Sequence, residues 1–108
     1  MDTVKFIQSI RDKKKVRVTF YSKSDDAELT RLCAPMDYGP SQRKNIKDTS
    51  NRFHLWDYES QSETPFHTLS LKADQIKKIE YTDLTFNPSE FVNWSTKWLI
   101  KRDWGIYS

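Results

Sequence analysis

The segment RFHLWDYES, which begins at Arg52, alternates side chains of two kinds. Successive residues of an extended strand point to opposite faces, so Arg52, His54 and Trp56 share one face, while Phe53 and Leu55 share the other. A guanidinium can bind phosphate oxygens and an indole can stack on a nucleobase. We therefore predict that one face of this strand packs in the core and that the other binds a ligand.

Two arginines in other predicted strands could extend this ligand-binding face. Arg17 lies in VRVTFY and Arg31 lies in ELTRLCAP. We predict that the fold gathers both with Arg52, His54 and Trp56 into one surface that binds a nucleotide or a short nucleic acid. No catalytic role is predicted for any of the five.

Two runs of basic residues could add phosphate contacts to this surface. The first contains Lys13, Lys14 and Lys15, and the second contains Arg43 and Lys44. Such contacts are mainly electrostatic and weaken as salt is added. The alternative is that both runs are solvated surface, since the formal net charge of the chain is only +3.

The remaining reactive residues argue against an enzyme and against a metal site or cofactor. Cys33 is the only cysteine, and His54 and His67 are the only histidines. They form no zinc-binding spacing, and Cys33 is expected in the core, as free cysteines usually are. Gly39 and Gly105 are too few for a glycine-rich phosphate loop, and no Ser-His-Asp order stands out.

Length and composition indicate one small globular domain. The chain has 108 residues, of which 36% are hydrophobic, 31% charged and 14% aromatic. The aromatic share argues against disorder, and 108 residues suit a single domain covering 1–108. No apolar run approaches the roughly 20 residues that span a bilayer, and a single cysteine fits a reducing compartment. We expect a soluble, cytoplasmic protein without membrane contact.

The elements that must position these residues follow from hydrophobic periodicity. Val4, Phe6, Ile7 and Ile10 recur near helical spacing, which predicts an N-terminal helix. Alternation predicts strands over residues 16–21, 28–35, 52–58, 65–71 and 76–81, with a long connection over 36–51.

The C-terminal segment is predicted to be a second helix. Asn87 suits its cap, Pro88 suits its first position, and Glu90 can complete a capping box. Trp94 and Trp98, four residues apart, would form its apolar stripe. The predicted fold class is therefore mainly β with flanking helices: an N-terminal helix, a five-stranded antiparallel SH3-like barrel and a C-terminal helix.

The order of these pieces resembles the WYL domain, a small SH3-like or Sm-like barrel of bacterial and phage-related regulators. The resemblance covers roughly Val4 to Pro88 and includes KVRVTFY, TRLCAP, FHLWDY, LSLKADQIKKIE and LTFNP. Arg31 stands at the arginine of the second strand. Phe53 and His54 stand where the family signature has tryptophan and tyrosine, and Leu55 is retained.

The resemblance implies a non-enzymatic module that senses a nucleotide or short nucleic acid through the β-scaffold, with Arg31 and His54 as its first residues to test. Family members usually carry a helix-turn-helix before this domain. Nothing precedes the first helix in this sequence, so we expect a stand-alone sensor, a relic or an adaptor. The alternative function is a protein-interaction or homo-oligomerisation module, because open strand edges and an aromatic helix can pair with another chain.

Overall fold

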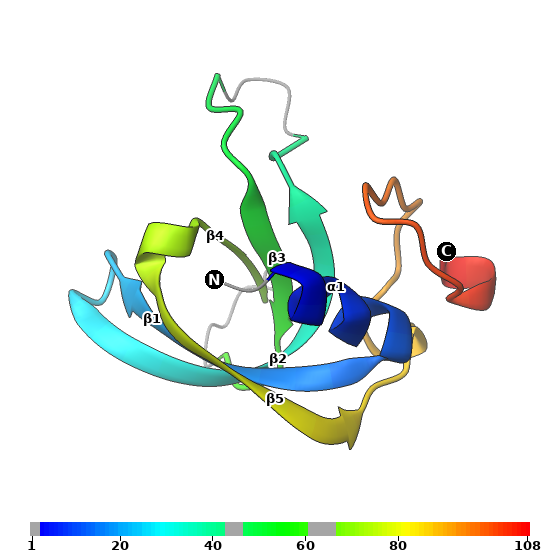
Figure 1. The fold of residues 1–108 in the computed structure, drawn as a ribbon, viewed down its shortest axis with the longest axis horizontal. Helices are drawn as coiled ribbons and strands as arrows, with labels where there is room; N and C mark the ends of the chain where they lie inside the picture. Colours follow the sequence, from blue (N-terminus) through cyan, green and yellow to red (C-terminus); the bar gives the residue numbers. More distant parts are fainter. Residues whose placement is uncertain (1–2, 43–46, 61–66) are drawn as a thin grey trace.

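The computed structural model describes residues 3–42, 47–60 and 67–108 and shows one helix beside a single five-stranded antiparallel sheet (Figure 1). The strand order is β4-β3-β2-β1-β5. The elements are α1 (Thr3–Asp12), β1 (Lys14–Ser22), β2 (Ala27–Gly39), β3 (Arg52–Asp57), β4 (Thr68–Leu71) and β5 (Ile76–Thr85), with 3₁₀ turns η1 (Ala73–Gln75), η2 (Pro88–Glu90) and η3 (Gly105–Tyr107).

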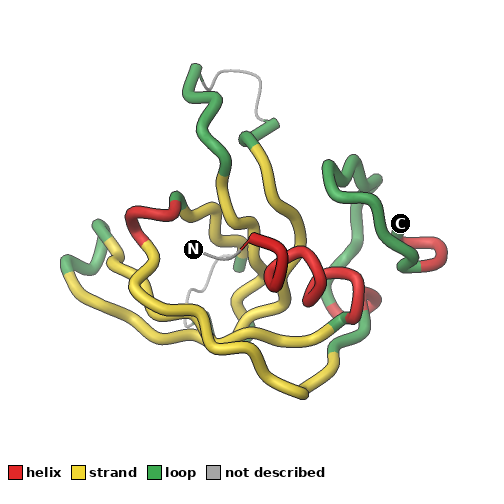
Figure 2. The backbone as a smooth tube through the Cα atoms, in the orientation of Figure 1, coloured by secondary structure: helices red, strands yellow, loops and turns green. Residues whose placement is uncertain are grey.

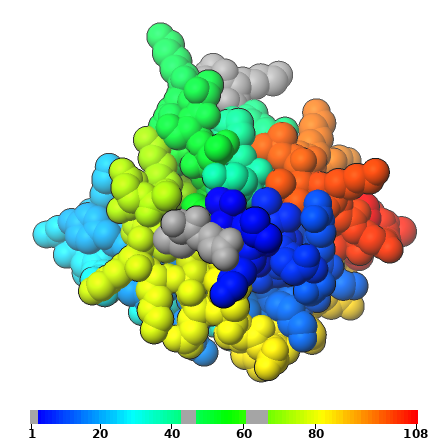
Figure 3. Space-filling view, viewed as in Figure 1, coloured from blue at the N-terminus to red at the C-terminus, as the bar shows by residue number. Residues whose placement is uncertain are grey.

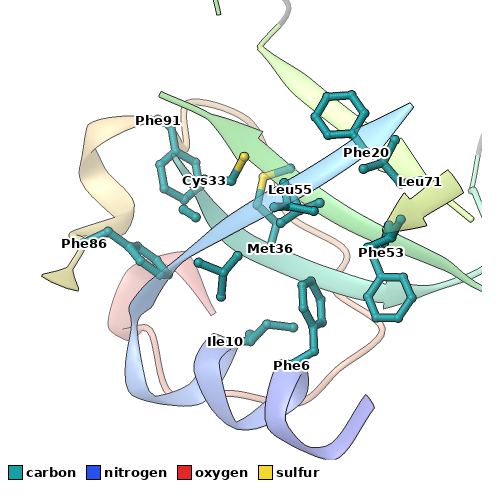
Figure 4. Close-up of a cluster of buried hydrophobic side chains, with 14 of the residues drawn as sticks. Phe6, Ile10, Phe20, Cys33, Met36, Phe53, Leu55, Leu71, Phe86 and Phe91 are labelled. Atoms are coloured by element: carbon teal, nitrogen blue, oxygen red, sulfur yellow. The ribbon is translucent and has the colours of Figure 1, made fainter. Parts of the chain in front are cut away.

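The predicted N-terminal helix is confirmed, and its apolar stripe packs on the sheet. Phe6 and Ile10 are fully buried, and the Phe6 ring meets the Phe53 ring edge to face with centroids 4.9 Å apart. Figure 4 shows both α1 side chains directed at the residues of the sheet. Lys13 follows with φ of 55°, a left-handed conformation that ends the helix and lets β1 start at once.

The first two strands form the predicted hairpin. Their register pairs Val16 with Cys33 and Ser22 with Ala27. Val16 and Cys33 are both fully buried, so the predicted core position of Cys33 is confirmed. Strand β5 pairs with the other side of β1, which places β1 in the middle of the curved sheet formed by β2, β1 and β5.

The sequence predicts that the second strand ends at Pro35, but the strand continues beyond it. β2 continues to Gly39, and the register with β3 shifts between Pro35 and Asp37. A bulge of this kind accommodates a residue that has no N–H to donate, so Pro35 stays buried inside the strand. The predicted long connection therefore begins after residue 39.

The predicted closed barrel is wrong, because the sheet is open between β4 and β5 in the described part of the chain. β4 has only four residues and pairs with β3. The chain then passes through η1 straight into β5, at the opposite edge of the sheet. A strand this short offers too few backbone groups to close the sheet.

The predicted C-terminal helix is also wrong. The capping box forms, since Asn87 Oδ1 accepts from Ser89 N and Glu90 Oε1 accepts from Asn87 N, but only the single turn η2 follows. Residues 91–108, here called the C-terminal arm, are irregular up to η3 and run beside α1 (Figure 2). In the space-filling view the arm covers one side of the molecule, next to α1 and the end of β2 (Figure 3).

The arm packs beside α1 and closes the core there. Phe86, Phe91 and Trp104 are buried and contact one another through their rings. Trp104 Nε1 also donates to the carbonyl oxygen of Ile10 at 2.9 Å, which joins the arm to α1. Among the described residues, no helix combines the length and the apolar character needed to cross a bilayer.

Candidate ligand-binding site

The five predicted site residues do not share one surface. Paired residues of antiparallel strands point to the same face of a sheet, and Val18 pairs with Arg31, while Arg17 pairs with Leu32. Arg31 therefore lies on the core face with Val18, and Arg17 lies on the opposite face. Arg17 is also remote from Arg52, because Leu32 and the partner of Arg52, Gly39, are seven residues apart on β2, roughly 20 Å along a strand.

Arg31 is occupied by groups of the protein itself. Its Nε lies 3.7 Å from Asp57 Oδ2, and its Nη1 donates to the Glu59 carbonyl oxygen at 3.3 Å. Burial raises the pKa of the Asp57 carboxyl, while the Glu59 backbone N–H and the Arg31 charge act in the opposite direction. Arg31 therefore compensates a buried carboxylate and is poorly placed to bind a ligand.

Arg52 lies on the wall of a cleft of about 460 Å³ and keeps one donor unused. Its Nη1 donates to the Ser70 carbonyl oxygen at 3.2 Å and its Nη2 to Asp48 Oδ2 at 3.3 Å, while its buried Nε has no hydrogen-bond partner among the described residues. This cleft, called the Arg52 cleft below, is lined by Tyr21, Lys23, Arg52, Ser70, Lys72, Asp74 and Gln75.

Asp48 joins two cations at this cleft. Its Oδ2 lies 2.6 Å from Lys72 Nζ as well as 3.3 Å from Arg52 Nη2. The hydrogen bond from Lys72, with further bonds from Ser50, holds the pKa of the Asp48 carboxyl well below its usual range. A carboxylate oxygen between an ammonium and a guanidinium occupies the kind of position that a phosphate oxygen takes in an anion site.

His54 is held in one orientation by both ring nitrogens. Its Nε2 lies 2.9 Å from the Gly39 carbonyl oxygen, and its Nδ1 lies 3.0 Å from Ser70 Oγ. A carbonyl oxygen can only accept, so Nε2 carries a proton, and in the neutral ring Nδ1 accepts from the Ser70 hydroxyl. His54 therefore fixes the hydroxyl of Ser70, a residue that lines both the Arg52 cleft and a second cleft.

The second cleft, called the aromatic cleft below, has a volume of about 390 Å³. One wall is the outer face of β3 and β4 with the end of β2, and the other wall is the C-terminal arm. Its lining residues are Met36, Asp37, Pro40, Ser41, Gln42, His54, Thr68, Ser70, Trp94, Ser95, Lys97 and Trp98. Gln42 Nε2 donates to the Lys97 carbonyl oxygen at 2.6 Å and bridges the two walls.

Trp56 packs against the arm. Its ring is stacked on Phe91, with centroids 5.4 Å apart and an interplanar angle of 15°, and it also contacts the His67 ring at 5.2 Å. Trp56 lines neither cleft. The indole that the sequence assigns to the ligand therefore fastens the arm, and Trp94 is the exposed indole beside a cleft.

The first basic run does not lie beside Arg52. Lys14 pairs with Thr85 of β5, and Lys15 Nζ lies 4.4 Å from the centroid of the Tyr58 ring. Tyr58 is six residues from Arg52, roughly 20 Å along an extended chain. The Lys13 backbone carbonyl oxygen accepts a hydrogen bond from Phe86 N at 3.0 Å. The other predicted pair, Arg43 and Lys44, lies outside the described residues.

The sequence analysis missed the residues that complete both clefts. Tyr21 reaches the Arg52 cleft from the end of β1, Lys23 from the β1–β2 turn and Lys72 from the residue after β4. No spacing in the sequence links these segments, because strand pairing brings them together: Phe20 pairs with Ile76, and Phe53 pairs with Leu71. Asp37, which holds the arm, has one usable signal: a carboxylate inside a predominantly apolar stretch.

Within the described ranges, no group of three or more His, Cys, Asp or Glu side chains could hold a metal ion. The side chains that line the two clefts include cations, hydroxyls and indoles.

No protein-family model matches the sequence, and no curated protein matches it. Among solved structures, the fold is similar to part of proteasome accessory factor B/C (PafBC) of Arthrobacter aurescens, with a TM-score of 0.59 and 14% sequence identity. The match covers 87% of this chain and only 13% of the PafBC chain. At this identity the likeness shows the fold alone, and it supports a WYL-like fold at most.

Proposed function

We propose that this chain is a non-enzymatic regulatory module that binds the phosphate group of a nucleotide or short single-stranded nucleic acid in the Arg52 cleft. The observation that carries this proposal is the buried Arg52 Nε, a charged donor without a partner among the described residues. A buried donor that stays unpaired costs free energy, typically about 1–3 kcal/mol, so an anion that reaches it gains affinity.

The charges around Arg52 favour an anion of high charge density. Lys23 and Lys72 line the same cleft together with Asp74, and Tyr21 adds a ring, while its hydroxyl donates to Asp26. Asp48 already engages Arg52 and Lys72, so a carboxylate-sized anion fits between these cations. A phosphate has more than one charged oxygen, so it can replace the Asp48 carboxylate as acceptor for both Arg52 and Lys72.

The test is calorimetric titration of the protein with pyrophosphate and with a five-residue oligothymidylate, at about 20 and 200 mM salt. We expect binding at low salt that weakens at high salt, because phosphate contacts release counterions. Arg52→Gln keeps the polar shape of the side chain and removes its charge, so it should weaken both ligands about tenfold or more.

Arg17→Gln is the matched control, because it removes the same charge from a strand position remote from the cleft. It should change both affinities less than about twofold. The proposal fails if neither ligand binds at low salt, or if Arg17→Gln and Arg52→Gln weaken binding equally, which would indicate an effect of net charge only. Thermal unfolding of each variant establishes that it is folded before titration.

A second candidate function is a protein-interaction module, favoured by the open edges of the sheet. Within the described residues, β4 and β5 each pair with one neighbour only. Such edges can pair with a strand of another chain, and Leu84 near the end of β5 is half exposed. Sedimentation at several concentrations tests self-association: a strictly monomeric chain that also captures no partner would count against this function.

A further inference from the structure

The aromatic cleft indicates which further part of a phosphate-containing ligand the protein could bind. Its two walls differ in chemistry. The sheet contributes hydroxyl groups from Thr68 and Ser70, beside the fixed ring of His54, and the arm contributes Trp94 and Trp98. A cleft with an aromatic wall and hydrogen-bonding groups opposite it suits a flat ring that has polar edges.

Trp94 is available to such a ring, whereas the neighbouring tryptophans serve the fold. Trp98 Nε1 donates to the Tyr107 carbonyl oxygen at 2.8 Å, and Trp104 is buried with its Nε1 bound to Ile10. Trp94 meets Trp98 edge to face, with centroids 6.0 Å apart, and 42% of its surface remains exposed. The fold thus leaves one indole beside the cleft without burying it.

The polar side of the cleft is preorganised. Because His54 donates from Nε2 to Gly39, its Nδ1 accepts from Ser70, and the Ser70 oxygen is left to accept a hydrogen bond from a ligand. Thr68 stands two residues before Ser70 on the same face of β4 and adds a second hydroxyl. These groups can pair with the amino and carbonyl groups at the edge of a heterocycle.

The two clefts share one lining residue, Ser70. Arg52 and His54 stand two residues apart on the same face of β3, a spacing of about 7 Å along a strand. A ligand that placed an anionic group at Arg52 would therefore extend its other end toward Trp94. The arrangement of Arg52 and Trp94 therefore favours a ligand in which a short spacer joins a phosphate to a flat ring.

We infer that the aromatic cleft binds the base of the nucleotide whose phosphate occupies the Arg52 cleft, with the base against the Trp94 indole and its edge at Ser70 and Thr68. The inference rests on the proposed function for the phosphate end only. Stacking of a base on an aromatic side chain is sequence-tolerant, so purines and pyrimidines should both bind.

The experiment titrates the full chain calorimetrically with AMP, CMP, adenosine, pyrophosphate and glucose at low salt. Trp94→Ala should weaken AMP and CMP about tenfold, because that is the usual effect of removing one stacking ring, and Trp94→Phe should restore most of the loss. Pyrophosphate affinity should change less than about twofold in both variants, since it reaches only the Arg52 cleft.

Ile106→Ala is the matched control, because Ile106 is an apolar residue of the same arm that is 91% exposed and outside the cleft. It should leave all ligands unaffected. The inference is overturned if Trp94→Ala leaves AMP binding intact while Arg52→Gln weakens it, which places the base elsewhere and keeps the phosphate site. It is also overturned if glucose binds more tightly than adenosine. If the unmodified chain does not bind pyrophosphate but binds adenosine, and if Trp94→Ala weakens the adenosine binding, the phosphate site is rejected and the base cleft is retained.

Discussion

Arg102 Nη2 lies 3.2 Å from Asp37 Oδ1, and the two side chains are 1% and 7% exposed. The Asp37 carboxylate also accepts from the backbone N–H groups of Leu99 and Ile100, both at 2.9 Å. The Arg102 guanidinium lies over the rings of both Trp98 and Trp104, 4.3 and 4.4 Å from their centroids. One buried ion pair therefore holds the arm on the end of β2, and its carboxylate residue, Asp37, also lines the aromatic cleft.

Arg102→Met should destabilise the protein by about 3–5 kcal/mol, because it leaves the Asp37 carboxylate buried without its cation. Urea unfolding followed by circular dichroism measures this change. Lys77→Met is the control, since the pair of Lys77 with Glu28 is exposed and should contribute less than about 1 kcal/mol. A loss below about 1 kcal/mol for Arg102→Met would show that the pair does not hold the arm.

This ion pair also explains why the C-terminal segment could not be predicted. Asn87, Pro88 and Glu90 carry a genuine helix start signal, and the capping box forms. A helix continues only if its backbone N–H groups bond carbonyl oxygens one turn earlier. The N–H groups of Leu99 and Ile100 instead bond the Asp37 side chain, more than 60 residues earlier in the sequence. Local signals cannot report such long-range competition, whereas α1 and β1 follow patterns that their own packing satisfies.

The sequence predicts the candidate site only within a single strand. Alternation correctly puts Arg52, His54 and Trp56 on one face of β3, opposite the buried Phe53 and Leu55. It could not show that the arm would cover Trp56. Alternation within one strand also cannot predict which residues of two strands pair, because the register depends on both strands and on the turn that joins them.

Gly39→Ala should lower stability more than Gly105→Ala. Both glycines have positive φ, 142° and 61°, but a Cβ at Gly39 would lie 2.5 Å from Leu99 Cδ1, whereas a Cβ at Gly105 meets nothing within 4 Å. Backbone strain costs about 1–2 kcal/mol at Gly105, and it is larger at Gly39, because a φ of 142° is adopted readily by glycine alone; the end of the Leu99 side chain must also move aside. Urea midpoints compare the two, and adding Leu99→Ala to Gly39→Ala should recover part of the difference. Equal losses would mean that the arm does not approach Gly39.

Stability should decrease as pH rises above about 9 through ionisation of Cys33. Burial raises the pKa of the Cys33 thiol above its ordinary value of 9.0, and the charges of Asp57 and Glu59 add to this effect. The unfolded thiol then loses its proton while the folded thiol keeps it, so the unfolded state gains about 1.4 kcal/mol at pH 10. Urea unfolding at pH 8 and pH 10 measures the change. Cys33→Ala should reduce this pH dependence by that amount, and an unchanged slope would contradict the role of the thiol.

Asp48→Asn should increase the affinity for pyrophosphate. The Asp48 carboxylate engages both Lys72 and Arg52, so an incoming anion must replace it and also meets its repulsion. Asparagine keeps the size of the side chain and removes the competing charge. Because exposed ion pairs contribute up to about 1 kcal/mol, the expected gain is about twofold to fivefold at low salt. Asp83→Asn makes the same charge change on β5, outside the lining of both clefts, and should have a smaller effect. Calorimetric titration compares the two variants, and a weaker affinity in Asp48→Asn would mean that Asp48 positions the cations for the ligand and does not compete with it.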